Sequence, residues 1–226
     1  MGAPILRRKG LIPMKKHILP LLIILISIVA SIWVYPQLPD QIPTHWGANG
    51  EVDDYSSKQT AVWMGPAIMV IVYAVLILMP KIDPKRANYP RFASSLYLVN
   101  TLLMLVFLGI QAVVISQWLG YEFNMSRFAP GLVGIIYLIL GNYLPRFQQN
   151  YYFGIKTPWT LTNPEVWRKT HLFAGRVFVS TGVLLLLSLL LPTAWMLPIL
   201  LFLLIGSALL IMASSYYFFK KQGNVH

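Results

Sequence analysis

Six long apolar segments limit what this chain can fold into more than any other feature of its sequence. The first of them, ILPLLIILISIVASIWVY at residues 18–35, contains no charged residue. A helix rises about 1.5 Å per residue, so about 20 apolar residues cross the ~30 Å hydrocarbon layer of a bilayer. The sequence therefore predicts an all-α, polytopic membrane protein with six transmembrane helices. These are expected at about residues 17–35, 61–79, 93–118, 129–144, 172–191 and 196–218.

The composition agrees with this interpretation and excludes several classes of protein. The chain is 57% hydrophobic and 11% charged, whereas a soluble domain carries about 25% charged residues. It contains no cysteine, which excludes disulfides, thiol catalysis and cysteine-ligated metals. The segment interiors hold essentially no ionisable residue, which argues against ion-coupled transport and intramembrane metalloproteases. Their main polar interruptions are Asn100, Gln111 and Gln117.

The 18 Lys and Arg residues fall almost entirely on one side of the predicted bundle. All but Lys58 and Arg127 lie at one set of segment ends, which the positive-inside rule makes cytoplasmic. Both termini are therefore predicted to be cytoplasmic. Because the cations flank membrane spans, the net charge of +11 indicates a lipid bilayer as the partner and no direct contact with nucleic acid.

Proline-rich connectors and the charge pattern divide the chain into five parts. Met14 opens the sequence MKKH, so residues 1–13 are interpreted as an alternative-start extension. The predicted parts are a basic cytoplasmic tail at 1–16, a two-span module at 17–79 with an extracytoplasmic loop at 36–60, a basic cytoplasmic linker at 80–92, a four-span unit at 93–219 with a cytoplasmic loop at 145–171, and a cytoplasmic tail at 220–226.

The extracytoplasmic loop, with the sequence YPQLPDQIPTHWGANGEVDDYSSKQ, is rich in proline and glycine. Three interpretations fit it: a compact turn-rich cap whose acids face water, a recognition surface for a cationic or apolar peptide, or a divalent-metal site. Trp46 beside acidic residues favours recognition. The spacing of the candidate metal ligands matches no metal signature, and no metal or cofactor is predicted. Those candidates are His45, Glu51, Asp53 and Asp54.

The cytoplasmic loop contains TLTNPEVWRK, which predicts the start of a helix. Either Thr162 forms a capping box with Glu165, or Asn163 caps a helix whose first residue is Pro164. Residues 166–169 should then form a short amphipathic helix that lies on the membrane surface and leads into the fifth span. Its tryptophan would point inward and its cations towards the headgroups.

Two family resemblances follow from these loops. The outer loop resembles an N-terminal module of undetermined function in bacterial membrane proteins, with the pattern LP-x-x-IP-x-HW followed by G, D and K. The matching residues are Leu38, Pro39, Ile42, Pro43, His45, Trp46, Gly50, Asp53 and Lys58.

The inner segment GNYLPRFQQNYYFGIKTPWTLTNPEVWRKTHLFAGRV resembles the signature of the SdpI family. Together with the outer-loop module and the six spans, this resemblance covers nearly the whole chain from Met14. The residues on the family pattern are Gly141, Asn142, Asn150, Gly154, Thr157, Pro158, Trp159, Thr160, Leu161, Trp167, Phe173 and Gly175. The candidate cytoplasmic motif is Asn142, Asn150, Gly154, Thr157, Pro158, Trp159, Thr160, Trp167 and Arg168.

The resemblance implies a function. Members of the SdpI family lie in the bacterial cytoplasmic membrane and protect the cell from an extracellular, membrane-active peptide toxin of the SDP type. The resemblance therefore implies an immunity protein that is also a signalling receptor, holding a cytoplasmic transcriptional autorepressor at the membrane. The residues expected to face the toxin are His45, Trp46, Asp53, Asp54 and Lys58.

Two other functions stay open from the residues. A facilitator or flippase for a small apolar molecule would need no charge within the membrane. A membrane enzyme acting on lipid could take acid–base groups from Thr157, Thr160, Glu165 and His171. These residues form no readable set of nucleophile, base and orienting group, so the chain is interpreted as a protein without catalytic residues.

Overall fold

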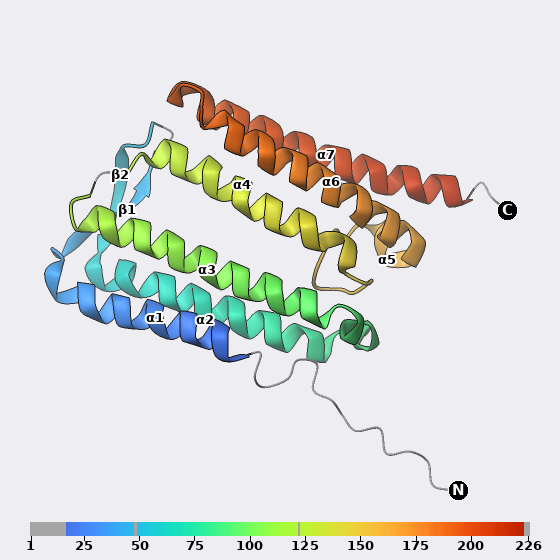
Figure 1. Ribbon diagram of the computed structural model, residues 1–226, viewed down its shortest axis with the longest axis horizontal. Coiled ribbons are helices and arrows are strands. Elements are labelled where there is room, and N and C mark those ends of the chain that lie inside the picture. Colours follow the sequence, from blue (N-terminus) through green and yellow to red (C-terminus); the bar gives the residue numbers. More distant parts are fainter. Residues whose placement is uncertain (1–16, 48, 122, 224–226) are drawn as a thin grey trace, which may run out of the picture.

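A computed structural model describes residues 17–47, 49–121 and 123–223, and the predicted basic tail at 1–16 lies outside them. Within this part of the chain, six helices are long and apolar enough to cross a membrane, as predicted. They lie side by side in one bundle (Figure 1). Their bounds are α1 Ile18–Val34, α2 Lys58–Ile82, α3 Ala93–Trp118, α4 Met125–Tyr143, α6 Pro164–Ser188 and α7 Met196–Gly223.

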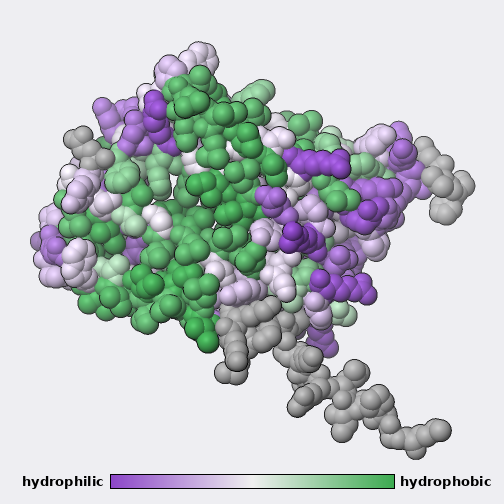
Figure 2. All heavy atoms as spheres, in the orientation of Figure 1, coloured by the Kyte–Doolittle hydropathy of each residue, from purple (hydrophilic) through white to green (hydrophobic). Residues whose placement is uncertain are grey.

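The bundle has two different ends, which we name by what they carry. The hairpin end carries a pair of strands, the loop between α3 and α4, and the turn between α6 and α7. The connector end carries the connectors at residues 83–92 and 144–163, together with the start of α1 and the end of α7. Figure 2 shows apolar surface over the middle of the helices and hydrophilic groups gathered towards the connector end.

The helices form two groups. α1, α2 and α3 pack against one another as the N-terminal group, and α4, α6 and α7 as the C-terminal group. The two groups meet mainly along α3 and α4. At the connector end they also share a buried apolar core. This core contains Tyr89, Phe92, Leu96, Val99, Leu144, Phe147, Ala174 and Ile211.

Glycine allows α4 and α6 to approach backbone to backbone. A Cβ atom on Gly141 would lie 2.9 Å from the carbonyl oxygen of Gly175, and one on Gly182 would lie 2.7 Å from that of Gly134. Neither position has room for a side chain. Small residues at such crossings are typical of membrane helices, where close backbone contact replaces the hydrophobic driving force available in water.

The loop that was predicted to be extracytoplasmic folds as a β-hairpin and not only as turns. Strands β1 (Gln41–Trp46) and β2 (Val52–Ser57) are antiparallel, and Gly50 takes a φ of +82° in the turn between them. A two-stranded sheet is marginal by itself in water. Here Ile42 is 1% exposed in an apolar cluster between α1, α2 and α3. The Trp118 indole N–H also donates to the Pro43 carbonyl at 2.8 Å.

The helix starts decide between the predicted caps. The Asn163 side chain accepts from the backbone N–H groups of Glu165 (2.8 Å) and Val166 (3.2 Å), and Pro164 is the first residue of α6. Thr162 instead ends the short helix α5 (Pro158–Thr162). The second alternative is therefore confirmed.

The predicted surface helix is wrong. Residues 166–169 form the first turns of α6, which continues without a break to Ser188. Trp167 is 2% exposed and packs inside the protein, so it does not dip into a membrane surface. The pattern of one tryptophan beside two cations could not distinguish a lipid contact from a protein contact.

Candidate ligand cavity and connector network

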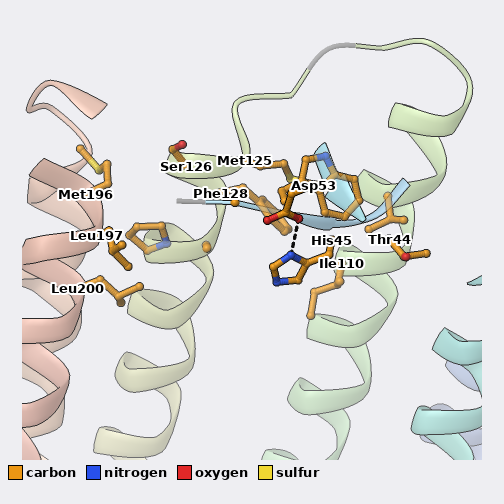
Figure 3. A pocket seen from close by; sticks show the side chains of 15 residues that line it. Thr44, His45, Asp53, Ile110, Met125, Ser126, Phe128, Met196, Leu197 and Leu200 are labelled. Atoms are coloured by element: carbon orange, nitrogen blue, oxygen red, sulfur yellow. Dashed lines mark hydrogen bonds and ion pairs between the residues drawn. The ribbon is translucent and has the colours of Figure 1, made fainter. Parts of the chain in front are cut away.

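A cavity of about 600 Å³ lies at the hairpin end, between the two helix groups and below the hairpin. Figure 3 shows its side chains coming from the hairpin, from α3, from α4 and from α7 into one space. Most of them are apolar, and methionine supplies a flexible, polarisable lining that adapts to different apolar partners. The main apolar residues are Ile110, Val114, Met125, Phe128, Met196 and Leu200.

The polar edge of this cavity comes from the hairpin. His45 Nδ1 lies 2.6 Å from Asp53 Oδ1, and both side chains are more than half exposed (Figure 3). Trp46 also lines the cavity. Its indole nitrogen is buried and has no hydrogen-bond partner within the described residues. A buried donor without an acceptor costs about 1–3 kcal/mol, so a ligand that supplied an acceptor would recover that free energy.

A second cavity of about 320 Å³ lies next to the first, between α2, α3 and the hairpin. Thr44, Trp46, Ile110 and Val114 line both cavities, so Trp46 belongs to the wall that separates them. Gln111 lines the second cavity at membrane depth. The Gln111 side chain already takes part in hydrogen bonds within the protein, and these would have to change before it could bind a ligand.

Those hydrogen bonds tie α3 to α1. The Gln111 amide nitrogen donates to Ser31 Oγ at 2.9 Å and to the Ser27 carbonyl at 3.1 Å. The Ser27 hydroxyl donates to the Gln111 amide oxygen. Burying these groups without partners would be costly in an apolar layer. The network explains one of the polar interruptions that the sequence placed inside a span.

The structure brings only some of the predicted toxin-facing residues to the cavity. His45, Trp46 and Asp53 line it. Asp54 is exposed and accepts from the Tyr55 backbone N–H at 2.8 Å. Lys58 Nζ lies 3.3 Å from Asp40 Oδ1, and neither residue lines the cavity. The described residues contain no group of three or more metal-ligating side chains.

At the connector end, Asp83 joins the two connectors. Its carboxylate is 1% exposed and accepts from the Tyr89 hydroxyl (2.7 Å) and the backbone N–H groups of Lys85 (2.6 Å) and Tyr151 (2.9 Å). Burial and the hydrogen bond to Asp83 raise the pKa of the Tyr89 hydroxyl well above its usual value. Tyr89 therefore stays protonated and remains a donor.

Asn150 and Gln149 hold the second connector in place. The fully buried Asn150 side chain accepts from the backbone N–H groups of Tyr152 (2.9 Å) and Phe153 (2.6 Å), and donates to the carbonyls of Gln148 and Phe153 at 2.9 Å. The Gln149 amide donates to the Thr160 and Leu161 carbonyls at 2.7 and 2.8 Å. From the first connector, Lys85 donates to the Gln149 side chain and Asn88 to its carbonyl.

Gly154 packs directly on a buried His171. Its φ is +108°, and a Cβ there would lie 2.3 Å from His171 Nε2. His171 Nε2 accepts from the Ile155 N–H at 3.0 Å, while Nδ1 donates to the Trp167 carbonyl at 2.8 Å. This pair of bonds requires a neutral ring with its proton on Nδ1. The Trp167 ring stacks on His171 with centroids 4.1 Å apart.

The Thr-Pro-Trp-Thr sequence builds and docks α5. Thr157 and Thr160 form a reciprocal capping box around the start of α5, and Pro158 is its first residue. Thr160 is fully buried and also donates to the Ile155 carbonyl at 2.8 Å. The Trp159 ring lies 5.1 Å from that of Tyr216 on α7. Capping and docking thus account for all four residues.

The remaining motif residues lie outside this network. Arg168 is exposed and pairs with Glu165 at 2.7 Å. Asn142 lies on α4, exposed, with its amide donating to the Leu138 carbonyl at 2.8 Å. Of the groups considered for lipid chemistry, Thr160 and His171 are buried in structural hydrogen bonds and Glu165 is held by a cation.

Comparison with known proteins supplies the family. Residues 146–215 match the SdpI/YfhL protein family, and residues 22–70 match a domain of unknown function, DUF1648. Immunity protein SdpI of Bacillus subtilis (strain 168) is 32% identical over 172 residues, which are 76% of this chain and 80% of that protein. The chain belongs to the SdpI family.

The other comparisons cover a smaller part of the chain or found no match. An uncharacterized protein of Archaeoglobus fulgidus is 36% identical over 70 residues, 28% of this chain and 38% of that protein. No solved structure matches the chain. Membership of the SdpI family and the six apolar helices make the chain a multi-pass protein of the bacterial cell membrane.

Proposed function

We propose that this membrane protein gives immunity against an extracellular, membrane-active peptide toxin, which it binds in the cavity below the hairpin. The observation that carries the proposal is the apolar cavity of about 600 Å³ between the two helix groups. The relative named an immunity protein, which aligns with 76% of this chain, supports it.

The lining of the cavity fits such a ligand. A membrane-active peptide carries apolar side chains together with backbone carbonyl groups. The apolar lining from α3, α4 and α7 receives the side chains, while the unpaired Trp46 indole N–H donates to a carbonyl. The exposed pair of His45 and Asp53 lies where a charged or polar terminus of the peptide would remain in water.

Signalling is the second part of the proposal. The connector end carries most of the cations, and a cytoplasmic transcriptional repressor with an acidic surface would dock there. Toxin bound between the helix groups changes their separation at the hairpin end, and the hydrogen bonds from Asp83 and Gln149 carry that change to the connectors. This coupling requires the two connectors to have two arrangements that each partner favours differently.

The alternative of a facilitator receives less support. A small apolar molecule would need a path from one end of the bundle to the other. At the connector end, the apolar core shared by the two helix groups occupies the seam between them.

Protection of toxin-sensitive cells tests the function. Val114 lines both cavities, so Val114→Trp places a large ring in this space and narrows it, whereas Leu105→Trp adds the same ring at an exposed position of the same helix. Cells that produce the wild type or Leu105→Trp should survive an added SDP-type peptide, and cells with Val114→Trp should be killed like empty cells. Membrane levels of all three proteins are measured by immunoblot. Equal protection by Val114→Trp at equal levels would contradict binding in the cavity.

The orientation has its own test. Because the chain has no cysteine, single cysteines can be labelled without background. Ser57→Cys at the hairpin end should react with a membrane-impermeant maleimide in intact cells, and Thr162→Cys at the connector end should react only after lysis. The opposite pattern would place the cavity inside the cell and remove the proposed toxin site.

A further inference from the structure

A groove of about 400 Å³ lies on the outside of the bundle between α4 and α6, close to the connector end. It is separate from the ligand cavity and shares no lining residue with it. Its floor is Gly141 and Gly175, where the two helices touch. Its polar side chains are Asn142, Arg176 and Ser180.

Neither glycine in the floor of the groove has room for a side chain. A Cβ on Gly175 would lie 2.8 Å from the Gly141 carbonyl oxygen, and one on Gly141 would lie 2.8 Å from the Val179 backbone nitrogen. The hollow beside this crossing is thus a fixed feature of the helix pair. Gly141, Asn142 and Gly175 belong to the family pattern, and the connector network does not account for Asn142.

Arg176 is an unpaired cation in this groove. It is exposed on an apolar helix, and none of the ion pairs within the described residues involves it. Both acids at this end are occupied: Asp83 is buried in the connector network, and Glu165 pairs with Arg168 and Lys169. Among the residues that the structure describes, the charge on Arg176 therefore has no counterion.

Two further hydrogen-bond donors line the same groove as Arg176. Ser180 lies one helical turn from Arg176 on the same face and carries a hydroxyl that can donate. The Asn142 amide uses one N–H for the Leu138 carbonyl and retains a second. A guanidinium with hydroxyl and amide donors is the chemistry that binds a phosphate group.

A second groove continues from the same residues. It has a volume of about 350 Å³, runs between α6 and α7, and contains both Arg176 and Ser180. From there it extends towards the hairpin end along apolar side chains such as Leu184, Phe202 and Leu203. A ligand with a phosphate at Arg176 would therefore have an apolar channel leading away from it into the bilayer.

We propose that the two grooves together bind one anionic phospholipid, with its phosphate at Arg176, Ser180 and Asn142 and an acyl chain between α6 and α7. Free phosphate would use the same donors but would leave the apolar groove empty. Specificity comes from the headgroup, since an acyl chain gains little by exchanging lipid neighbours for apolar side chains. Basic pockets between helices at the cytoplasmic side are a known form of lipid recognition.

Lipid retention tests the site. The full chain is purified in a zwitterionic detergent with equal amounts of phosphatidylglycerol and phosphatidylcholine, and bound lipid is counted by native mass spectrometry. We expect the wild type to retain phosphatidylglycerol preferentially. Arg176→Gln should reduce that retention about tenfold, the effect of one charge-assisted contact. Lys220→Gln removes one charge at the same end outside both grooves and should leave retention unchanged.

Three results would overturn the proposal. They are equal retention of the two lipids by the wild type, equal loss in Arg176→Gln and Lys220→Gln, and displacement of the lipid by millimolar inorganic phosphate. Equal unfolding temperatures of the two variants in lipid-free detergent show that both are folded. The outcome is independent of toxin protection, because Arg176 does not line the toxin cavity.

Discussion

The two helix groups meet differently at the two ends of the bundle. At the connector end, hydrogen bonds of Asp83, Gln149 and Asn150 with the other connector and a shared apolar core join the two helix groups. At the hairpin end the groups stand apart around the larger cavity, a second cavity lies within the N-terminal group, and the Trp46 indole N–H has no acceptor within the described residues. The difference indicates that the connector end contributes most to the stability of the bundle, whereas the hairpin end leaves space for a ligand.

The largest effect is expected from Asn150→Ala. Two backbone N–H groups would lose their acceptor in a fully buried position, at about 1–3 kcal/mol each. The free energy of unfolding should therefore fall by about 3 kcal/mol or more, measured by thermal or chemical unfolding in detergent. Asn142→Ala, an exposed asparagine on α4, is the matched control and should change it by less than about 0.5 kcal/mol. Similar values for the two would contradict the role of the connector end.

Gly154→Ala should have the next largest effect. The substitution places a Cβ at a φ of +108° and against His171 Nε2, so we expect a loss of about 2 kcal/mol from backbone strain and steric overlap. Gly109→Ala provides a comparison of opposite sign, because its added Cβ in α3 has no atom within 4 Å apart from its chain neighbours and the backbone of its own helix. That change should stabilise by about 0.5–1 kcal/mol. If both alanines stabilised the protein, the packing of the second connector on His171 would be wrong.

The smallest effect on stability concerns the hairpin end. Trp46→Phe removes a buried donor that has no partner within the described residues, so the free energy of unfolding should rise by about 1 kcal/mol while toxin protection falls. Trp118→Phe makes the same change in a tryptophan whose N–H donates to the Pro43 carbonyl, and it should destabilise by about 1 kcal/mol. Destabilisation by both variants would show that Trp46 has an acceptor in the free protein.

Sequence patterns were enough for the spans and for the start of α6. Apolar runs report membrane helices directly, and the predicted third span at 93–118 has the bounds of α3. Asn163 followed by Pro164 identified a helix start, since both residues act within one turn. The surface helix was wrong because burial of Trp167 depends on Phe147, whose carbonyl accepts its N–H at 2.8 Å from the far side of the connector.

The sequence predicted only the polar part of the lining of the candidate cavity. His45, Trp46 and Asp53 stood out because polar and aromatic groups are conspicuous in a short loop. Met125 and Met196, on two other segments, contribute as much to the lining, yet each looks like any apolar residue of a span. Only the fold brings them together. The hairpin was also missed, because its strands alternate weakly and Pro43 lies within β1.

The glycine contacts between α4 and α6 have a mechanical consequence. On each helix the two glycines are seven residues apart, at positions 134 and 141 and at positions 175 and 182, so the backbones touch at two levels two turns apart. Two contacts of this kind prevent the helices from pivoting about a single point, and the pair therefore moves as one rod. When a ligand widens the cavity, α4 should travel with α6, and the displacement should appear along the seam with α3.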